Sequence, residues 1–390
     1  MRHYWPAMTG GGAMTEMGPG RNGTSSRFAW PLRRRTPAGP EGTAEDIAVQ
    51  DVAEREAADR RLPPPAPEPL VDPPPRFHLA MFRLAALGLA LVLALGLALV
   101  RVFGSGPPSV ADLRAQSGVD TWTVLPIGVK DDQPGTAIRD ENGVWSGFDI
   151  EIAYMIAEDL GFRRDDVRFY GMESEDRARM QGVDLKGNRV PVKLVVASFS
   201  ITAEREARQD VTFSEPYLFT EQSVLTLKDH RPVATLRDLK GESVCSLSTA
   251  TSASALERPE LDIDVVSRNR MRECIADLRG GKVTAVSTDA AILAGFKARS
   301  PDEFAHWDLG VDATEAYGVN VGNNEALKKL VDLTLYRSYY DPADGRWEEA
   351  YQRNLQSETK ANGKVPIAIA TQPRPARPAI RELPWEDVFR

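Results

Sequence analysis

The longest apolar run in the chain spans residues 84–100 and contains no polar residue. Extended to residues 79–103, it reaches the ~20 residues that a helix needs to cross ~30 Å of hydrocarbon. Arg83 and Arg101 bracket the run, where long basic side chains can reach the headgroups. A secretory signal would lie within the first ~15–30 residues and carry a shorter apolar region. We therefore predict a single transmembrane helix over residues 78–103.

Beyond this run, apolar stretches of strand length alternate with helical patterns. Residues 190–199 contain a continuous apolar run, which is typical of a strand buried on both faces. In residues 148–160 apolar positions recur at helical spacing, and Gly161 follows as a stop signal. This alternation predicts an α/β protein with parallel sheets, long enough for two lobes. Further expected strands are 122–129, 167–170, 224–227, 244–247, 263–266 and 284–286, and further expected helices are 236–239, 252–256, 270–279, 289–298 and 325–340.

The two ends of the chain differ in composition from this region. Residues 1–77 hold few large apolar residues and end in a Pro-rich stretch, so they bury too little surface to offset the entropy of ordering. We predict a disordered tail there, in which residues 45–61 read either as a short helix or as a solvated charged segment. Residues 104–120 read as a linker. Residues 361–390 are Pro-rich again and read as an extended or disordered tail.

Composition excludes several classes of function. The 390 residues include 48 Lys and Arg against 56 Asp and Glu, a formal net charge of -8. That balance argues against a nucleic-acid-binding protein, which needs a basic surface. With four His and two Cys, zinc sites of the Cys₄ or Cys₂His₂ kind are almost excluded. The common nucleotide-binding, zinc-protease and hydrolase strings are absent, which makes an enzyme less expected without excluding one. We predict a non-enzyme with no metal and no cofactor.

Several short strings recur in a fixed order through the globular region. They are IGVKDDQPG at 127–135, GFDI at 147–150, ASFSITAER at 197–205, VTFSEPY at 211–217, DLKG at 238–241, STD at 287–289 and YGV at 317–319. This ordered set resembles the bacterial extracellular solute-binding proteins of family 3, the polar-amino-acid type. The first string is similar to that of glutamate-type members from actinobacteria. The resemblance covers essentially all of residues 121–358.

The resemblance implies a periplasmic-binding-protein-like fold. Two α/β lobes joined by a two-strand hinge would close on a ligand between them. The binding domain would span residues 121–360, with the first lobe at 121–226 and 318–358 and the second at 229–315. It would lie outside the cell membrane, anchored by the single helix, with the N-terminal tail in the cytoplasm. It would capture a polar amino acid, glutamate-like or glutamine-like, and deliver it to an ABC transporter permease.

The resemblance also implies which residues would hold the ligand's charges. Arg205 matches the family's carboxylate-binding Arg, and a guanidinium can grip a carboxylate through two parallel hydrogen bonds. Thr202 would cap the helix that carries it. Asp289, on the second lobe, matches the Asp that binds the ammonium group. Read without the resemblance, Arg205 lies on a solvated helix face and Asp289 caps the next helix.

The remaining implied contacts come from small polar residues. Ser200 matches a hydroxyl that touches the ligand, and Ser198 offers its backbone carbonyl. Thr251 and Ser252 match a loop whose N–H groups meet the carboxylate from the second lobe.

The chain departs from the family pattern at three places. The loop at 248–252 lacks the usual Gly, so Thr249 or Thr251 would shift the backbone. Aromatic residues that often flank the ligand are missing, and residues 181–191 carry an insertion. Asp131 falls near one missing aromatic, so we expect it to line the pocket and to disfavour glutamate and aspartate by like-charge repulsion.

Cys245 and Cys274 both lie in the proposed second lobe. Outside the membrane, two cysteines that close a loop of ~30 residues are expected to pair, with a stabilisation of ~3 kcal/mol. Two buried free thiols would instead suit a cytosolic domain. The resemblance favours the disulfide.

Two other functions stay open alongside transport. A tail of this length exceeds what an anchor needs, so the protein could be an amino-acid sensor that signals to a cytoplasmic partner. It could also be an enzyme of the same fold, such as a dehydratase, in which Glu173 and Asp131 would supply acid and base groups. Deletion of residues 2–75 separates transport from sensing.

Overall fold

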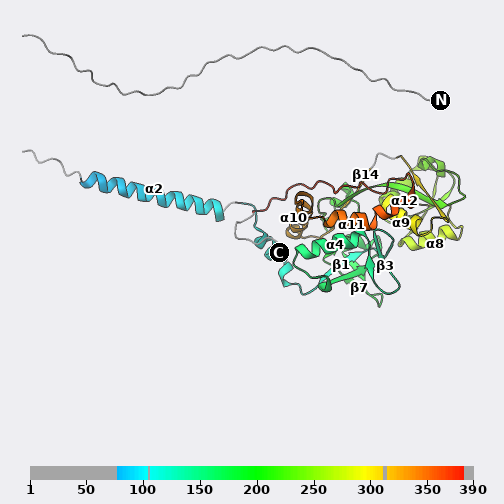
Figure 1. Ribbon diagram of the computed structural model, residues 1–390, viewed down its shortest axis with the longest axis horizontal. Coiled ribbons are helices and arrows are strands. Elements are labelled where there is room, and N and C mark those ends of the chain that lie inside the picture. The colour runs from blue at the N-terminus through cyan, green and yellow to red at the C-terminus, as the bar shows by residue number, and fades with distance from the viewer. Residues whose placement is uncertain (1–76, 104–105, 311–313, 382–390) are drawn as a thin grey trace, which may run out of the picture. The chain divides into compact units, whose positions relative to one another are not determined.

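The computed structural model describes residues 77–103, 106–310 and 314–381 (Figure 1). It divides into two units, residues 1–83 and 84–390. In the first unit only the start of helix α2 (Phe77–Phe103) is described. The predictions for residues 1–76, including the candidate helix at 45–61, lie outside the described residues.

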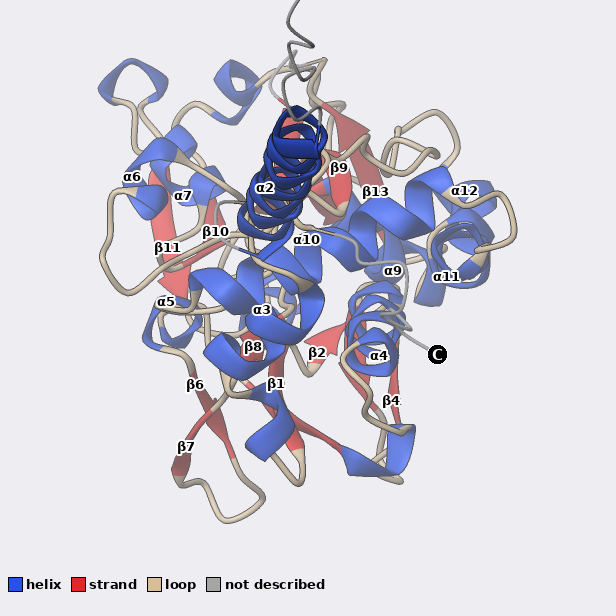
Figure 2. Cartoon of the chain, turned by 90° about the vertical axis from the view of Figure 1, so that its left-hand side faces the viewer, coloured by secondary structure: helices blue, strands red, loops and turns tan. Residues whose placement is uncertain are grey.

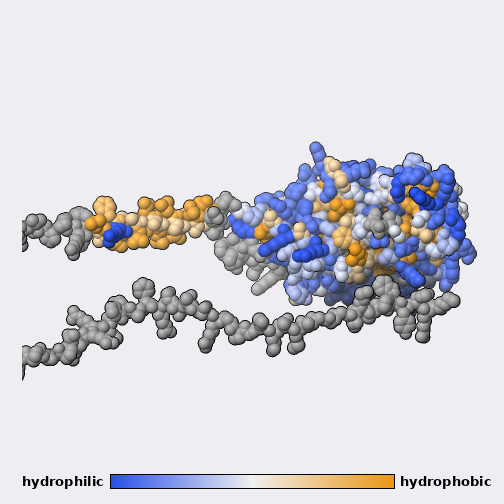
Figure 3. Space-filling model, turned by 90° about the horizontal axis from the view of Figure 1, so that it is seen from above, coloured by the Kyte–Doolittle hydropathy of each residue, from blue (hydrophilic) through white to orange (hydrophobic). Residues whose placement is uncertain are grey.

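Helix α2 has the length and composition of a membrane-spanning helix. Its segment Leu79–Val100 has a mean hydropathy of 2.4, and none of it is buried. Figure 3 shows an apolar surface along most of this helix. Among the described residues it is the single helix that meets these criteria, and it coincides with the predicted span.

Part of the predicted linker is helical. Helix α3 (Val110–Ser117) begins at a capping box in which Ser109 and Asp112 bond to each other's backbone. It ends at Gly118, whose φ of 75° is the left-handed conformation that favours glycine. Leu113 is 1% exposed and belongs to the core that also contains helix α10 residues. The linker interpretation missed these caps and this apolar face.

The first lobe is built on a sheet with the order β7-β6-β5-β1-β8. Strand β1 pairs in parallel with β5 and β8, whereas β6 and β7 form an antiparallel hairpin at one edge. A small three-stranded sheet, β2-β3-β4, lies beside it. The strands are β1 (Leu125–Val129), β2 (Asp132–Gln133), β3 (Ala137–Arg139), β4 (Trp145–Ser146), β5 (Val167–Gly171), β6 (Gln181–Val183), β7 (Arg189–Pro191) and β8 (Leu194–Val195).

The second lobe is built on a sheet with the order β11-β10-β12-β9-β13. Parallel pairing of β10 with β11 and β12 continues into antiparallel pairing of β12 with β9. The strands are β9 (Leu218–Leu227), β10 (Ser243–Leu247), β11 (Asp264–Arg268), β12 (Ala285–Asp289), β13 (Phe304–Asp308) and β14 (Thr314–Tyr317). The chain passes between the lobes along β9 and β14, which pair antiparallel and form the two-strand connection.

Helices pack against the sheets of both lobes (Figures 1 and 2). The α-helices of the lobes are α4 (Phe148–Asp159), α5 (Asp176–Arg179), α6 (Ala203–Glu206), α7 (Thr251–Leu256), α8 (Met271–Arg279), α9 (Ala290–Arg299), α10 (Glu325–Tyr340), α11 (Arg346–Asn354) and α12 (Thr359–Asn362). Short 3₁₀ turns lie at η1 (Val119–Thr121), η2 (Arg164–Asp166), η3 (Leu236–Leu239), η4 (Pro259–Leu261) and η5 (Gln356–Glu358). The predicted α/β architecture of two lobes joined by two strands is confirmed.

Each lobe has its own apolar core. In the first lobe, Ile127 of β1 and Ile156 of α4 belong to one cluster with Trp347 of α11, all fully buried. In the second lobe, two clusters include residues of β10 and β12. One of them contains Cys245 of β10 and Cys274 of α8, which form a disulfide. The predicted pairing of the two cysteines is confirmed.

Of residues 361–390, expected to be extended or disordered, residues 361–362 end helix α12, and the described segment that follows packs against the lobes. Thr220 Oγ1 of β9 donates to the carbonyl of Ile367 at 2.7 Å, and the N–H of Ile369 donates to the carbonyl of Phe219 at 2.9 Å. Gln372 Nε2 donates to the carbonyl of Leu335 at 3.0 Å. Frequent Pro prevents a helix here, while the backbone bonds hold the segment in place. Residues 382–390 lie outside the described part of the chain.

Candidate functional site

A cavity of about 10 Å³ lies between the two lobes. The first lobe contributes strand β2, helix α5 and the segment from β8 to α6. The second lobe contributes the carboxyl ends of β10 and β12 and the starts of the helices that follow them. The lobes are closed on each other, because Arg205 and Asp131 of the first lobe bond to Thr249 and Arg270 of the second. The lining residues are Gln133, Arg177, Ser198, Ser200, Arg205, Leu247, Ala250, Thr251, Thr288, Asp289 and Ile292.

Arg205 reaches across the cavity from one lobe to the other. Thr202 caps α6, as predicted, and its Oγ1 accepts a hydrogen bond from the N–H of Arg205 at 3.3 Å. The guanidinium donates through Nη1 to the carbonyl of Ser200 at 2.6 Å and through Nη2 to the carbonyl of Thr249, on the second lobe, at 2.7 Å. It also lies over the ring of Phe199, 4.7 Å from the centroid. Arg205 is therefore fixed at the lobe interface and does not extend into solvent.

A second guanidinium, that of Arg177 on α5, lines the same cavity and is 4% exposed. It donates through Nε to the carbonyl of Ser174 at 3.1 Å and through Nη1 to that of Ser198 at 2.9 Å. Burial lowers the pKa of Arg177 to about 9, and the charge of Arg205 acts in the same direction. Sequence reasoning missed this residue, because a charged string such as EDRAR reads as a solvated surface.

Asp289 is the acidic side chain of the cavity. It occupies the N-cap position of α9 but makes no side-chain capping bond, and instead accepts a hydrogen bond from Tyr317 Oη at 2.5 Å. Asp289 is 5% exposed. Burial raises its pKa to about 7, with the charge of Glu315 acting in the same direction. The alternative role predicted for Asp289, helix capping by its side chain, is not what the structure shows.

Ser198 and Ser200 both line the cavity, and a buried carboxylate shapes their loop. Asp149 Oδ2 accepts from the Ser198 N–H at 2.8 Å and from Ser198 Oγ at 3.0 Å. These bonds hold Ser198 at a φ of 46°, in the left-handed region. Burial raises the pKa of Asp149 to about 6. The GFDI string therefore supplies a support for the site and not a lining residue.

The loop at 248–252 brings only part of its expected residues to the cavity. Thr251 lines it, whereas Ser252 turns away and its Oγ lies 2.9 Å from Ser246 Oγ in the second lobe. Thr249, one of the two residues expected in place of a glycine, takes a φ of 60° and turns its carbonyl to Arg205. The backbone thus keeps a glycine-like conformation without glycine.

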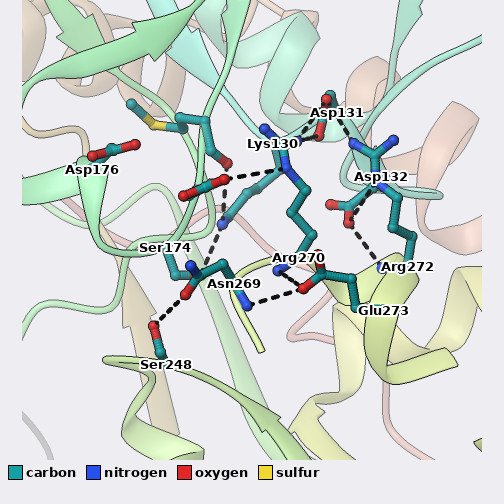
Figure 4. A network of polar contacts seen from close by, with 12 residues as sticks. Lys130, Asp131, Asp132, Ser174, Asp176, Ser248, Asn269, Arg270, Arg272 and Glu273 are labelled. Carbon is teal, nitrogen blue, oxygen red and sulfur yellow. Dashed lines mark hydrogen bonds and ion pairs between the residues drawn. The ribbon is translucent and has the colours of Figure 1, made fainter. Parts of the chain in front are cut away.

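Asp131 lies outside this cavity and joins the lobes elsewhere (Figure 4). Its two carboxylate oxygens accept from Arg270 Nη1 at 2.7 and 2.9 Å, and Arg272 Nη2 donates to Oδ2 at 2.9 Å. The N–H of Arg272 donates to Asp132 Oδ2 at 2.9 Å. The expectation that Asp131 lines the pocket and repels acidic ligands is therefore wrong, because two arginines of the second lobe neutralise it.

The network around Asp131 also contains a buried lysine (Figure 4). Lys130 Nζ donates to Ser174 Oγ at 2.8 Å, and burial lowers the pKa of Lys130 to about 7. Glu173 Oε1 lies 3.7 Å from Arg270 Nε, and Glu173 Oε2 lies 3.9 Å from Arg189 Nη2. Neither Glu173 nor Asp131 lines the cavity. The acid and base groups considered for a dehydratase are therefore engaged in ion pairs away from it.

Gln133 contributes an unpaired donor to the cavity. Its side chain is fully buried, and its Nε2 has no hydrogen-bond partner among the described residues. Its Oε1 lies 3.4 Å from Ser198 Oγ. A group that accepts hydrogen bonds would satisfy Nε2 from within the cavity. Within the described residues, no group of three or more His, Cys, Asp or Glu side chains is placed to hold a metal ion.

Comparison with known proteins gives relatives that are mostly amino-acid-binding proteins, with membrane-bound lytic murein transglycosylase F of Ectopseudomonas mendocina also matching at 25% identity over 224 residues, 56% of this chain and 44% of that protein. Residues 125–357 match the family described as bacterial extracellular solute-binding proteins, family 3. The chain is 28% identical over 294 residues to the glutamate-binding protein GluB of Corynebacterium efficiens, covering 73% of this chain and 94% of that protein. It is 29% identical over 238 residues to the ABC transporter glutamine-binding protein GlnH of Bacillus subtilis, covering 60% of this chain and 81% of that protein.

A solved structure shows the same fold. An ancestral arginine-binding protein bound to glutamine superposes with a TM-score of 0.52 and 26% sequence identity. The match covers 60% of this chain and 98% of that chain.

Proposed function

The chain belongs to the bacterial extracellular solute-binding proteins, family 3, and from this premise we propose that its two lobes close on an acidic L-amino acid, with glutamate as the best fit. The observation that carries the proposal is the charge of the interlobe cavity. Two guanidiniums, of Arg177 and Arg205, line it together with one carboxylate, that of Asp289.

The common part of an amino acid fits two of these groups. A planar guanidinium such as that of Arg205 pairs with the α-carboxylate, and the carboxylate of Asp289 pairs with the α-ammonium group. The two side chains lie on different lobes, so both ligand charges favour closure. Ser200 and Thr251 add hydroxyl and backbone groups at the same cavity.

The guanidinium of Arg177, the third charged group of the cavity, determines which ligand side chain fits best. Arg177 donates to backbone carbonyls and, within the described residues, forms no ion pair with a carboxylate. Gln133 Nε2 adds a donor that has no hydrogen-bond partner among those residues. A buried cation and an unpaired donor on the same cavity favour a ligand side chain that ends in a carboxylate, because it supplies both a negative charge and hydrogen-bond acceptors. A ligand side chain that ends in an amide supplies only the hydrogen bonds. Glutamate and aspartate therefore fit better than glutamine, and a cationic side chain is repelled.

Calorimetry of the full chain in detergent tests this proposal with L-glutamate, L-aspartate, L-glutamine and L-arginine. We expect glutamate to bind at least ~10-fold more tightly than glutamine, and Arg177→Gln to abolish that preference. Arg179→Gln is the matched control, because this neighbour on α5 is exposed and pairs with Glu175 and Asp176. Tighter binding of glutamine or arginine than glutamate by the unmodified chain would contradict the proposal.

We also propose that α2 anchors the protein in the cell membrane, with the tail in the cytoplasm and the lobes outside, and that the ligand passes to an ABC permease. The apolar span and the names of the relatives support this role. Uptake of labelled glutamate by cells should survive deletion of residues 2–75. If that deletion abolishes a cellular response to glutamate and leaves uptake unchanged, the protein is a sensor. We propose no catalytic activity.

A further inference from the structure

A second and larger cavity lies on the first lobe, beside the β6–β7 hairpin. Its volume is about 550 Å³, which falls in the range of small-molecule sites. It shares no lining residue with the interlobe cavity. The hairpin coincides with the insertion at residues 181–191. In Figure 2 it projects from the bottom of the first lobe. The inserted residues thus build one wall of a cavity that the proposed function does not use.

Aromatic rings form another wall of this cavity. Trp145 of β4 and Phe169 of β5 both line it, with their ring centroids 5.8 Å apart. Tyr154 of α4 packs edge-on against Phe169, with centroids 5.0 Å apart, and so fixes the position of that ring. Fixed rings that border a cavity offer a stacking surface for a flat, conjugated ligand.

The charged residues of the cavity leave a positive balance. The Arg139 guanidinium lies 5.7 Å from the Trp145 ring centroid, and its Nε is buried with no hydrogen-bond partner among the described residues. Lys186 is exposed at the hairpin tip and makes no ion pair within the described part of the chain. Both cations line the cavity, and within the described residues neither forms an ion pair with a carboxylate.

The two acidic residues of the cavity are already engaged. Asp184 Oδ1 accepts from the N–H groups of Lys186 at 2.9 Å and Asn188 at 2.7 Å, inside its own turn. Asp131 is paired with Arg270, which also lines the cavity from the second lobe. Neither carboxylate is available to Arg139 or Lys186, so an anionic group from a ligand would find two unpaired cations.

We propose that this cavity is a second binding site, and that its ligand is a small aromatic anion. The ring would lie against Trp145 and Phe169, and the acidic group would be held by Arg139 and Lys186. A carboxylate and a phosphate supply the same chemistry here. The site shares no lining residue with the interlobe cavity, and Arg270 reaches it from the second lobe.

Calorimetry on the full chain in detergent tests the proposal with indole-3-acetate and AMP as aromatic anions. Three comparators each lack one feature: indole has no charge, acetate has no aromatic ring, and tryptamine carries a positive charge in place of the negative one. We expect one site per chain for the aromatic anions, with affinities at least ~10-fold above those of the comparators. Tighter binding of indole-3-acetate identifies a carboxylate ligand, and tighter binding of AMP identifies a phosphate ligand.

Variants then locate the site. Arg139→Gln should lower the affinity for the tighter anion at least ~10-fold, and Lys186→Gln, at an exposed turn, should lower it without changing the melting temperature. Arg163→Gln is the matched control, because this arginine is exposed on the same lobe and lies outside the cavity. Its affinity should equal that of the unmodified chain.

Three results would overturn the proposal. The first is absence of binding of either anion at millimolar concentration. The second is equal binding of indole or tryptamine, which would remove the role of the cations. The third is displacement of the anions by saturating L-glutamate, which would place them between the lobes. This last result leaves the proposed amino-acid binding intact, so the two proposals fail separately.

Discussion

The affinity for an amino acid should depend on pH through Asp289. An ammonium group pairs with an ionised carboxylate and not with a neutral carboxyl group, so binding requires the ionised form. Burial raises the pKa of Asp289 to about 7, with Glu315 acting in the same direction and the hydrogen bond from Tyr317 opposing it. At a pH about 1.5 units below that pKa, only about 3% of Asp289 is ionised. Affinity should therefore fall ~30-fold, or about 2 kcal/mol at 1.36 kcal/mol per unit.

The same group affects the stability of the unliganded protein in the opposite direction. Because the folded-state pKa of Asp289 is raised above its ordinary 3.8, the folded chain binds this proton more readily than the unfolded chain does. The resulting stabilisation is fully present below about pH 4 and is lost as the pH rises through about 7. Ligand binding strengthens over the interval in which this contribution to the free energy of unfolding declines.

Titration of the full chain with L-glutamate by calorimetry, between about pH 5.5 and pH 8, measures the effect. Asp289→Asn should bind with an affinity that is flat over this interval and close to that of the unmodified chain at about pH 5.5. Burial also raises the pKa of Asp149 to about 6, so the Asn variant isolates the part due to Asp289. The reasoning is refuted if Asp289→Asn keeps the original pH dependence or binds as tightly at about pH 8.

Three further changes test other parts of the structure. Replacing both Cys245 and Cys274 with Ala should lower the free energy of unfolding in guanidinium chloride by about 3–4 kcal/mol, the loop entropy for a separation of 29 residues; equal denaturation midpoints would contradict this. Gly295→Ala adds a Cβ that meets the carbonyl of Pro134 on the facing lobe, so glutamate affinity should fall while the melting temperature stays constant; unchanged affinity would show that closure is not limiting. Arg270→Gln removes the paired hydrogen bonds between the lobes, which should lower glutamate affinity ~10-fold and increase the radius of gyration in X-ray scattering; a compact variant with full affinity would exclude this role.

Periodicity predicted the longer elements of the fold. Residues 325–340 carry an unbroken helical pattern and form α10 over that same range, and the expected strands at 244–247 and 284–286 overlap β10 and β12. Helix α3 was missed because its signal is a capping box within a short segment. Strands of two or three residues, as in β2, β3 and β4, are too short to show an alternation.

The candidate site was predicted only where the ordered strings reached it. Those strings placed Arg205 and Asp289 on opposite lobes, and both line the cavity. Arg177 was missed because its surroundings are charged in sequence and become buried only through tertiary packing against Phe199. Asp131 was misplaced because its partners, Arg270 and Arg272, approach it only when the lobes close.

Calorimetry of L-glutamate binding to the full chain and to Arg205→Ala tests the central claim most directly. Arg208→Ala is the control, because that arginine is exposed and pairs with Asp210. Loss of two charge-assisted hydrogen bonds, at about 1.5–3 kcal/mol each, predicts at least ~100-fold weaker binding for Arg205→Ala and no change for Arg208→Ala. Glutamate binding that is equal in the unmodified chain and in Arg205→Ala would contradict the account.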